Sequence, residues 1–319
     1  MIRRTKTASM TATKTETATE IPDHHIGRRK LDIAGIVFQL ALVASLLACF
    51  AFLMVLIVDV VKDGAPVFAE RGTDFLTSDL SRDPAQTGVW QGIKGSIMLA
   101  MITLIVAIPL GVACAVYLEE YAPATRLTRF INLNIRNLAG VPSVVYGILG
   151  LVIFVQWFEG FTGGRSVIAG GLTLSVLVLP IVVITSAEAI RAVPQSLREA
   201  GFGVGATRWD VTRRLVLPDA SPGILTGLIL SLSRAIGETA PLLLVGAVAS
   251  NFFTSGNAGY LEQLHGTYTA LPVTVLTWAR QPQAEFRELT SAAIVVLLGI
   301  TLLANLAAIL LRNRYQKKR

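Results

Sequence analysis

The sequence has little charge and few residues that carry chemistry, and each shortage narrows the function. Only 15% of its residues are charged, against roughly a quarter in a soluble domain. The two cysteines, Cys49 and Cys114, fall inside apolar runs and supply neither a disulfide framework nor a metal-ligand spacing. The first 27 residues are polar and threonine-rich, without the apolar core of a signal peptide. We expect no cleaved leader and no thiol chemistry.

Motifs that mark nucleotide or hydrolytic sites are also missing. No G-x-x-x-x-G-K-[ST] stretch occurs, and the nearest glycine-rich segment, GVWQGIKGS from Gly88, has the wrong spacing for a phosphate-binding loop. HExxH and G-x-S-x-G are absent as well. We therefore expect no catalytic residue, no metal and no cofactor bound by this chain, and any ATP hydrolysis would come from a partner.

Long apolar runs account for most of what is present. The hydrophobic content is 53% and the mean hydropathy is +0.61. Because about 20 apolar residues span the hydrocarbon layer, the pattern predicts an all-α integral membrane protein. Six spans are expected, over residues 33–61, 92–118, 139–158, 166–190, 223–249 and 289–311. Residues 1–27 are predicted to be a disordered tail, 28–88 the first span with its following loop, and 89–319 the remaining domain.

The basic residues predict the orientation. They are dense before the first span, after the second and fourth, and after the last, so those segments and both termini should be cytoplasmic in a bacterial plasma membrane. The segment from Asp63 to Gln91 and the loop over 250–288 should lie outside, where Phe252, Phe253 and Trp278 contact a partner or fold back on the bundle. His24 and His25 would then lie on the other side of the membrane from His265, so they form no common metal site.

Two polar stretches interrupt this pattern, and the first follows the second span. There Arg126, Arg129 and Arg136 alternate with apolar residues, as in a short helix lying along the cytoplasmic interface.

The second polar stretch, EAGFGVGATRWDVTRRLVLP over residues 199–218, predicts a helical hairpin. Ser196 with Glu199 and Thr207 with Asp210 have capping-box spacing. Gly203 and Gly205 suit the turn, and Pro218 is expected to end the second helix. A helix-turn-helix DNA reader, a solvated loop and a docking element are the possible interpretations. Docking is favoured, with apolar contacts from Leu197, Phe202 and Trp209, because a reader tethered between two spans has little reach.

Arg234 and Glu238 are four residues apart in the fifth span and therefore share a helix face, which Gly227 and Ser231 continue. A charge at this depth costs a few kcal/mol and must face protein or water. The pair is either a structural lock or part of a polar solute path in which Arg234 attracts an anion. Pro241 and Gly237 would loosen the helix beside it.

The spacing of the hairpin resembles the EAA loop of ABC importer permeases, EAA-x3-G-x9-I-x-LP, here within residues 194–218. Gly201 replaces the second alanine and Leu215 the isoleucine. The resemblance implies a six-helix permease of the type I importer kind. The positions that it assigns to ATPase coupling are Glu199, Ala200, Gly205, Leu217 and Pro218.

The stretches PGILTGLILSLSRAIGETAPLL, LPVTVLTWA and NLAGVPSVVYGILGL are similar to the phosphate-specific permease family PstA. That resemblance implies inorganic phosphate as substrate and Arg234, Glu238 and Ser231 in its path. It also implies a PstC-like second permease, two PstB-like ATPases, a PstS-like binding protein and no nucleic acid. A permease for sulfate, molybdate or a phosphonate, a secondary transporter, and a membrane signalling component are the alternatives.

Overall fold

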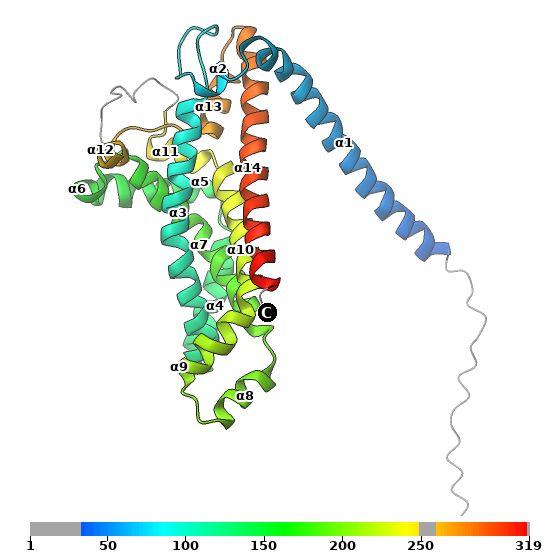
Figure 1. Cartoon of the computed structure of the whole chain (residues 1–319), viewed down its shortest axis with the longest axis vertical. Helices are drawn as coiled ribbons and strands as arrows, with labels where there is room; N and C mark the ends of the chain where they lie inside the picture. The colour runs from blue at the N-terminus through cyan, green and yellow to red at the C-terminus, as the bar shows by residue number, and fades with distance from the viewer. Residues whose placement is uncertain (1–32, 249–259, 318–319) are drawn as a thin grey trace, which may run out of the picture. The chain divides into compact units, whose positions relative to one another are not determined.

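A computed structural model describes residues 33–248 and 260–317, and the regular structure within these ranges is helical (Figure 1). The expected tail over 1–27 lies outside the described residues. The first half contains α1 (Ile33–Arg71), α2 (Asp74–Thr77), α3 (Trp90–Val116), η1 (Tyr117–Tyr121), α4 (Arg126–Ala139), α5 (Ser143–Gly150), η2 (Leu151–Trp157), α6 (Glu159–Thr162) and α7 (Val167–Arg191). The second half contains α8 (Gln195–Gly203), α9 (Arg208–Val211), η3 (Thr212–Val216), α10 (Leu217–Gly237), α11 (Ala240–Val245), α12 (Tyr260–His265), α13 (Leu271–Trp278) and α14 (Glu285–Lys317). The η segments are π-helical.

The chain divides into two units, residues 1–54 and 55–319. The described part of the first unit is the exposed apolar beginning of α1. In the second unit α1 continues to Arg71, ten residues past the predicted end of the span, and α2 follows it. The expected loop from Asp63 is therefore partly helical. The reason is packing, since a Cβ built on Gly64 would lie 2.9 Å from the backbone nitrogen of Ala292 in α14.

Small residues allow the helices of the second unit to approach closely. A Cβ on Gly111 of α3 would lie 2.6 Å from Val182 of α7, and one on Gly171 of α7 would lie 2.6 Å from Ile102 of α3. A Cβ on Gly227 of α10 would lie 2.0 Å from the Thr185 hydroxyl of α7. Close backbone approach through glycine is a general device of membrane helix packing. It places α7 between α3 and α10.

The third predicted span, over 139–158, begins at a sharp bend. Helix α4 and the segment formed by α5 and η2 meet there at 102°, and they add a sixth candidate span to five continuous ones if the bent pair is counted as one. Pro142 stands at the N-cap of α5, where the residue before a proline is sterically biased away from helix. The expected amphipathic helix after the second span is present as α4, which has no buried residue.

The fifth predicted span is wrong at both ends. One continuous helix runs over Arg208–Gly237, so Pro218 does not end the second hairpin helix. The π-helical segment η3 ends at Val216, and Pro218, the second residue of α10, follows it without interrupting the helix. At the other end α10 stops at Gly237, and Pro241 lies in the first turn of the separate helix α11.

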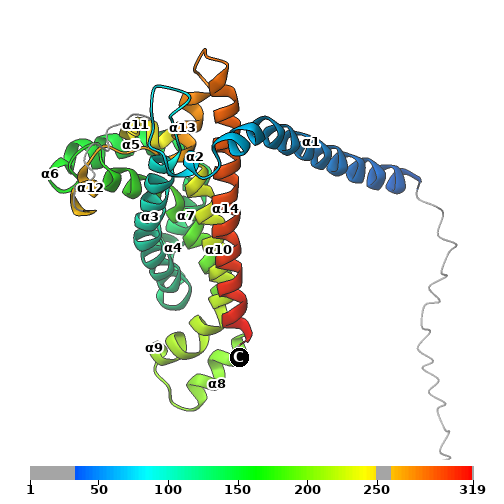
Figure 2. The same cartoon turned by 45° about the horizontal axis from the view of Figure 1, so that its top comes forward.

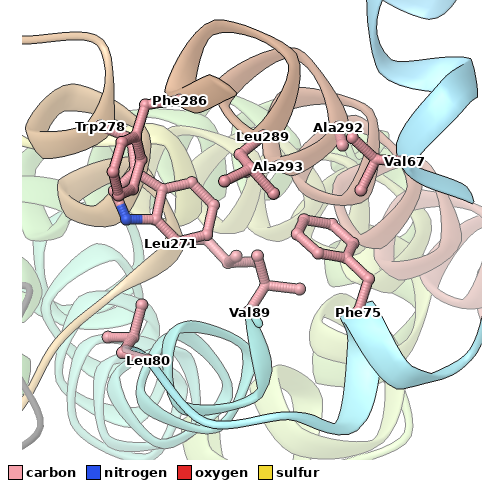
Figure 3. Close-up of a cluster of buried hydrophobic side chains, with 10 residues drawn as sticks. All are labelled: Val67, Phe75, Leu80, Val89, Leu271, Trp278, Phe286, Leu289, Ala292 and Ala293. Carbon is pink, nitrogen blue, oxygen red and sulfur yellow. The ribbon is translucent and has the colours of Figure 1, made fainter. Parts of the chain in front are cut away.

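A buried apolar cluster lies at the end of this unit where α2 and α13 are found, away from α8 and α9 (Figures 1, 2 and 3). Trp278, with 4% of its surface exposed, stands 6.4 Å from Phe75 and 6.0 Å from Phe286 between ring centroids. Trp278 thus folds back onto the bundle, whereas Phe252 and Phe253 lie outside the described residues. The contacts between these rings join α2, α13 and α14.

Candidate coupling hairpin and solute path

The polar stretch predicted to be a hairpin forms two short helices, α8 and α9, joined by a turn. Gly205 has φ +81°, a left-handed conformation that favours glycine. Gly203 has no positive φ and is the last residue of α8. The Thr207 hydroxyl caps α9 by accepting a hydrogen bond from the Asp210 N–H at 3.2 Å, as its spacing predicted. The capping box expected at Ser196 is absent, because the N-cap of α8 is Pro194, two residues earlier.

Gly201 explains how the two hairpin helices fit together. It is the buried residue of α8, and a Cβ built on it would lie 2.8 Å from side-chain carbons of Val211 and Leu215. The departure from alanine at this position therefore lets α8 lie directly on the start of the next helix. The hairpin is held as a unit by this contact.

Three large apolar side chains of the hairpin are exposed. Phe202, Val204 and Trp209 expose 47%, 84% and 55% of their surfaces. Leu197, expected among these docking contacts, instead packs against the buried apolar cluster at the ends of the helices that the hairpin joins. Val204 was missed, because a valine beside two glycines carries no distinct signal. Exposed apolar groups of this size on a polar hairpin are typical of a docking surface.

The five predicted coupling residues fall into two groups. Glu199 and Ala200 are exposed on α8, and Gly205 forms the turn. Leu217 and Pro218 are half-buried in the first turn of α10, where Leu217 packs against the same apolar cluster as Leu197. The structure thus places three of them on the hairpin and two at its root. Their role in coupling stays a prediction.

The predicted ion pair is formed across the end of a helix. The Arg234 Nε donates to Glu238 Oε1 at 3.2 Å, with 42% and 17% of the two side chains exposed. Glu238 follows the last residue of α10 and is extended, with ψ 129°, so the pair does not lie on one continuous helix face. A charged pair on an exposed flank of a membrane span implies a protein or aqueous neighbour.

Ser231 is not brought to this pair. It is buried, with 4% exposure, and its hydroxyl donates to the Gly227 carbonyl at 2.9 Å. Its side chain lines a cavity of about 10 Å³ together with Thr103 and Val182 from the neighbouring helices. The expected role of Ser231 in the solute path therefore stays a prediction without support from its contacts.

A family profile decides what kind of protein carries this hairpin. The profile described as "Binding-protein-dependent transport system inner membrane component" matches residues 107–317. The chain belongs to this family. The matched residues run from α3 into α14, so the hairpin and the ion pair of the permease both fall inside them, whereas α1 does not.

Similar proteins in bacteria carry phosphate-permease names. The permease is 34% identical over 226 residues to phosphate transport system permease protein PstA 1 of Mycobacterium tuberculosis, covering 70% of each chain. It is 39% identical to the PstA protein of Mycobacterium leprae, covering 67% of this chain and 68% of that one. The PstA protein of Yersinia pestis is 35% identical, with 69% and 71% covered.

Solved structures share the fold of the permease. The MetNI methionine ABC transporter in an inward facing conformation aligns with a TM-score of 0.55 at 17% identity, over 71% of this chain and 97% of that one. A bacterial ABC transporter involved in the import of the acidic polysaccharide alginate gives 0.52 at 15% identity, over 84% and 95%. At these identities the likeness concerns the fold alone.

Two long-range ion pairs of the permease were not foreseen. Arg198 of α8 pairs with Glu120, and Arg191 of α7 pairs with Glu119, both partners lying in η1. The only sequence signal is the doublet Glu119-Glu120 directly after an apolar run. Within residues 33–248 and 260–317, no three His, Cys, Asp or Glu side chains are grouped so that they could hold a metal ion.

Proposed function

We propose that this permease carries inorganic phosphate into the cell as one subunit of an ATP-driven importer. The observation that carries the proposal is the Arg234–Glu238 pair, an exposed charged group beside a break in a membrane span. Phosphate at neutral pH carries one or two negative charges, and removing it from water requires compensation by a cation such as this guanidinium. The neighbouring carboxylate keeps the attraction moderate, so the anion is released as well as captured. The names of the similar proteins favour phosphate over other oxyanions.

The exposed surfaces of this chain indicate where the other subunits of the importer would bind. The exposed flank that carries Arg234 would be covered by a second, PstC-like permease, and the path would run between the two. The hairpin would dock on one of two PstB-like ATPases through Phe202, Val204 and Trp209. A PstS-like protein would deliver phosphate at the other end of the bundle. The charge distribution supports this orientation, with hairpin and termini in the cytoplasm.

Competition experiments test the substrate. The complex of this permease with its partner subunits and binding protein is reconstituted in liposomes, and uptake of labelled phosphate is measured against excess arsenate, sulfate or molybdate. We expect unlabelled phosphate and its close analogue arsenate to compete, and sulfate and molybdate to leave uptake intact. Stronger competition by sulfate or molybdate than by phosphate would assign the permease to another oxyanion.

A further inference from the structure

The π-helical segment η1, at the end of α3, touches both helices of the hairpin. Glu120 is 8% exposed, and its Oε1 accepts hydrogen bonds from Arg198 Nε at 3.1 Å and Arg198 Nη2 at 2.9 Å. The next residue, Tyr121, has the guanidinium of Arg208 over its ring at 5.4 Å. One short segment thus contacts α8 through Glu120 and α9 through Tyr121.

Arg198 also binds the end of α7. Its Nη1 donates to the Val193 carbonyl at 2.7 Å, and its Nη2 donates to the Ile190 carbonyl at 2.9 Å. Ile190 lies in the last turn of α7, and Val193 lies two residues beyond its end. Carbonyl groups at a helix C-terminus have no hydrogen-bond partner within the helix. A single side chain on the hairpin therefore joins the ends of two transmembrane helices, α3 through η1 and α7.

The neighbouring pair provides a contrast. Arg191 and Glu119 also join α7 to η1, but Arg191 is 57% exposed and neither residue lies on the hairpin. An exposed pair of this kind contributes little to stability. The Arg198–Glu120 pair is largely withdrawn from water, and removing one partner of such a pair leaves an uncompensated buried charge.

We propose that Arg198 and Glu120 are positioning residues for energy coupling, which make α8 move together with α3 and α7 when the ATPase moves the hairpin. This inference rests on the proposed docking role of the hairpin. It goes beyond that role by assigning the point at which the movement enters the membrane helices. Without the pair, the hairpin would still dock and the ATPase would still work, but α8 would pass less of its movement to α3 and α7.

The test compares Glu120→Ala with Glu119→Ala in the complete reconstituted complex. Phosphate uptake and ATP hydrolysis are measured in the same liposomes, and their ratio is the readout. We expect Glu120→Ala to lower the ratio by roughly fivefold or more, the lower end of coupling between distant sites, with ATP hydrolysis retained. Glu119→Ala should keep the wild-type ratio. A fault in folding alone would reduce the amount of complex but leave the ratio unchanged.

A second variant covers the case in which Glu120→Ala does not assemble. Arg198→Lys keeps the charge but loses the forked geometry that reaches Glu120 and two carbonyls at once, so the ratio should also fall. A wild-type ratio in either assembled variant, or an equal fall in Glu119→Ala, overturns the proposal. If the wild-type complex moves a different anion, the phosphate assignment fails, and the ratio is then measured with that anion.

Discussion

Replacement of Arg234 tests the solute path most directly, and its magnitude can be worked from the structure. Two unit charges 4 Å apart attract by about 1 kcal/mol in water and about 4 kcal/mol at an effective dielectric constant of 20. Arg234 is 42% exposed in this chain, and Glu238 at 3.2 Å offsets part of its charge. An intermediate value of about 2 kcal/mol corresponds to roughly 30-fold in rate.

Arg234→Gln should therefore lower the initial rate of phosphate uptake by at least about 30-fold. The measurement uses labelled phosphate in cells without other phosphate importers, normalised to the amount of complex in the membrane. The uptake rate of Arg234→Lys should lie between those of the wild type and Arg234→Gln, because lysine keeps the positive charge but places it elsewhere. Ser233→Ala is the matched control on the adjacent residue, whose hydroxyl bonds Asn305 rather than the pair. Normal uptake in Arg234→Gln would remove Arg234 from the path.

Two further predictions concern packing and docking. Gly227→Val should destabilise the permease by about 1–3 kcal/mol through overpacking against Thr185, seen as a lower melting temperature in detergent. Gly299→Ala should not lower the melting temperature, because a Cβ built there would meet no atom of a neighbouring segment within 4 Å. Trp209→Ala should cost about 2 kcal/mol of ATPase affinity, measured by co-purification, if Trp209 is a buried anchor of that interface. Trp157 on η2 is 75% exposed, and Trp157→Ala should leave co-purification of the ATPase unchanged. Equal losses of affinity in the two variants would refute docking through Trp209.

The sequence predicted those structural features whose cause lies within a few neighbouring residues. Apolar runs long enough to cross a membrane predicted the helical class, and the Thr207 hydroxyl caps α9 because its bond to the Asp210 N–H spans only three residues. Arg234 and Glu238 were paired on the same grounds, and the pair is formed. Charge, spacing and capping act over a few residues of the chain, so they can be read without knowledge of the fold.

The errors have tertiary or backbone causes. Helix α1 outlasts its apolar run because Gly64 packs on α14, a contact between residues more than 200 positions apart. Pro218 was expected to end a helix, but the π turn η3 resets the hydrogen-bond pattern before it and the helix continues. The Arg198–Glu120 pair joins residues 78 positions apart, so no spacing rule could find it.

The continuity of the helix over Arg208–Gly237 gives the hairpin mechanical reach. Trp209 and Arg234 are separated by 25 residues of the same helix, which at 1.5 Å per residue is about 37 Å. A tilt of about 5° about one end of such a rod displaces the other end by about 3 Å, and Glu238 moves with it because it directly follows the last residue of the helix. The second hairpin helix and Arg234 therefore belong to one continuous rod, so the exposed Trp209 and the ion pair lie toward opposite ends of a single element.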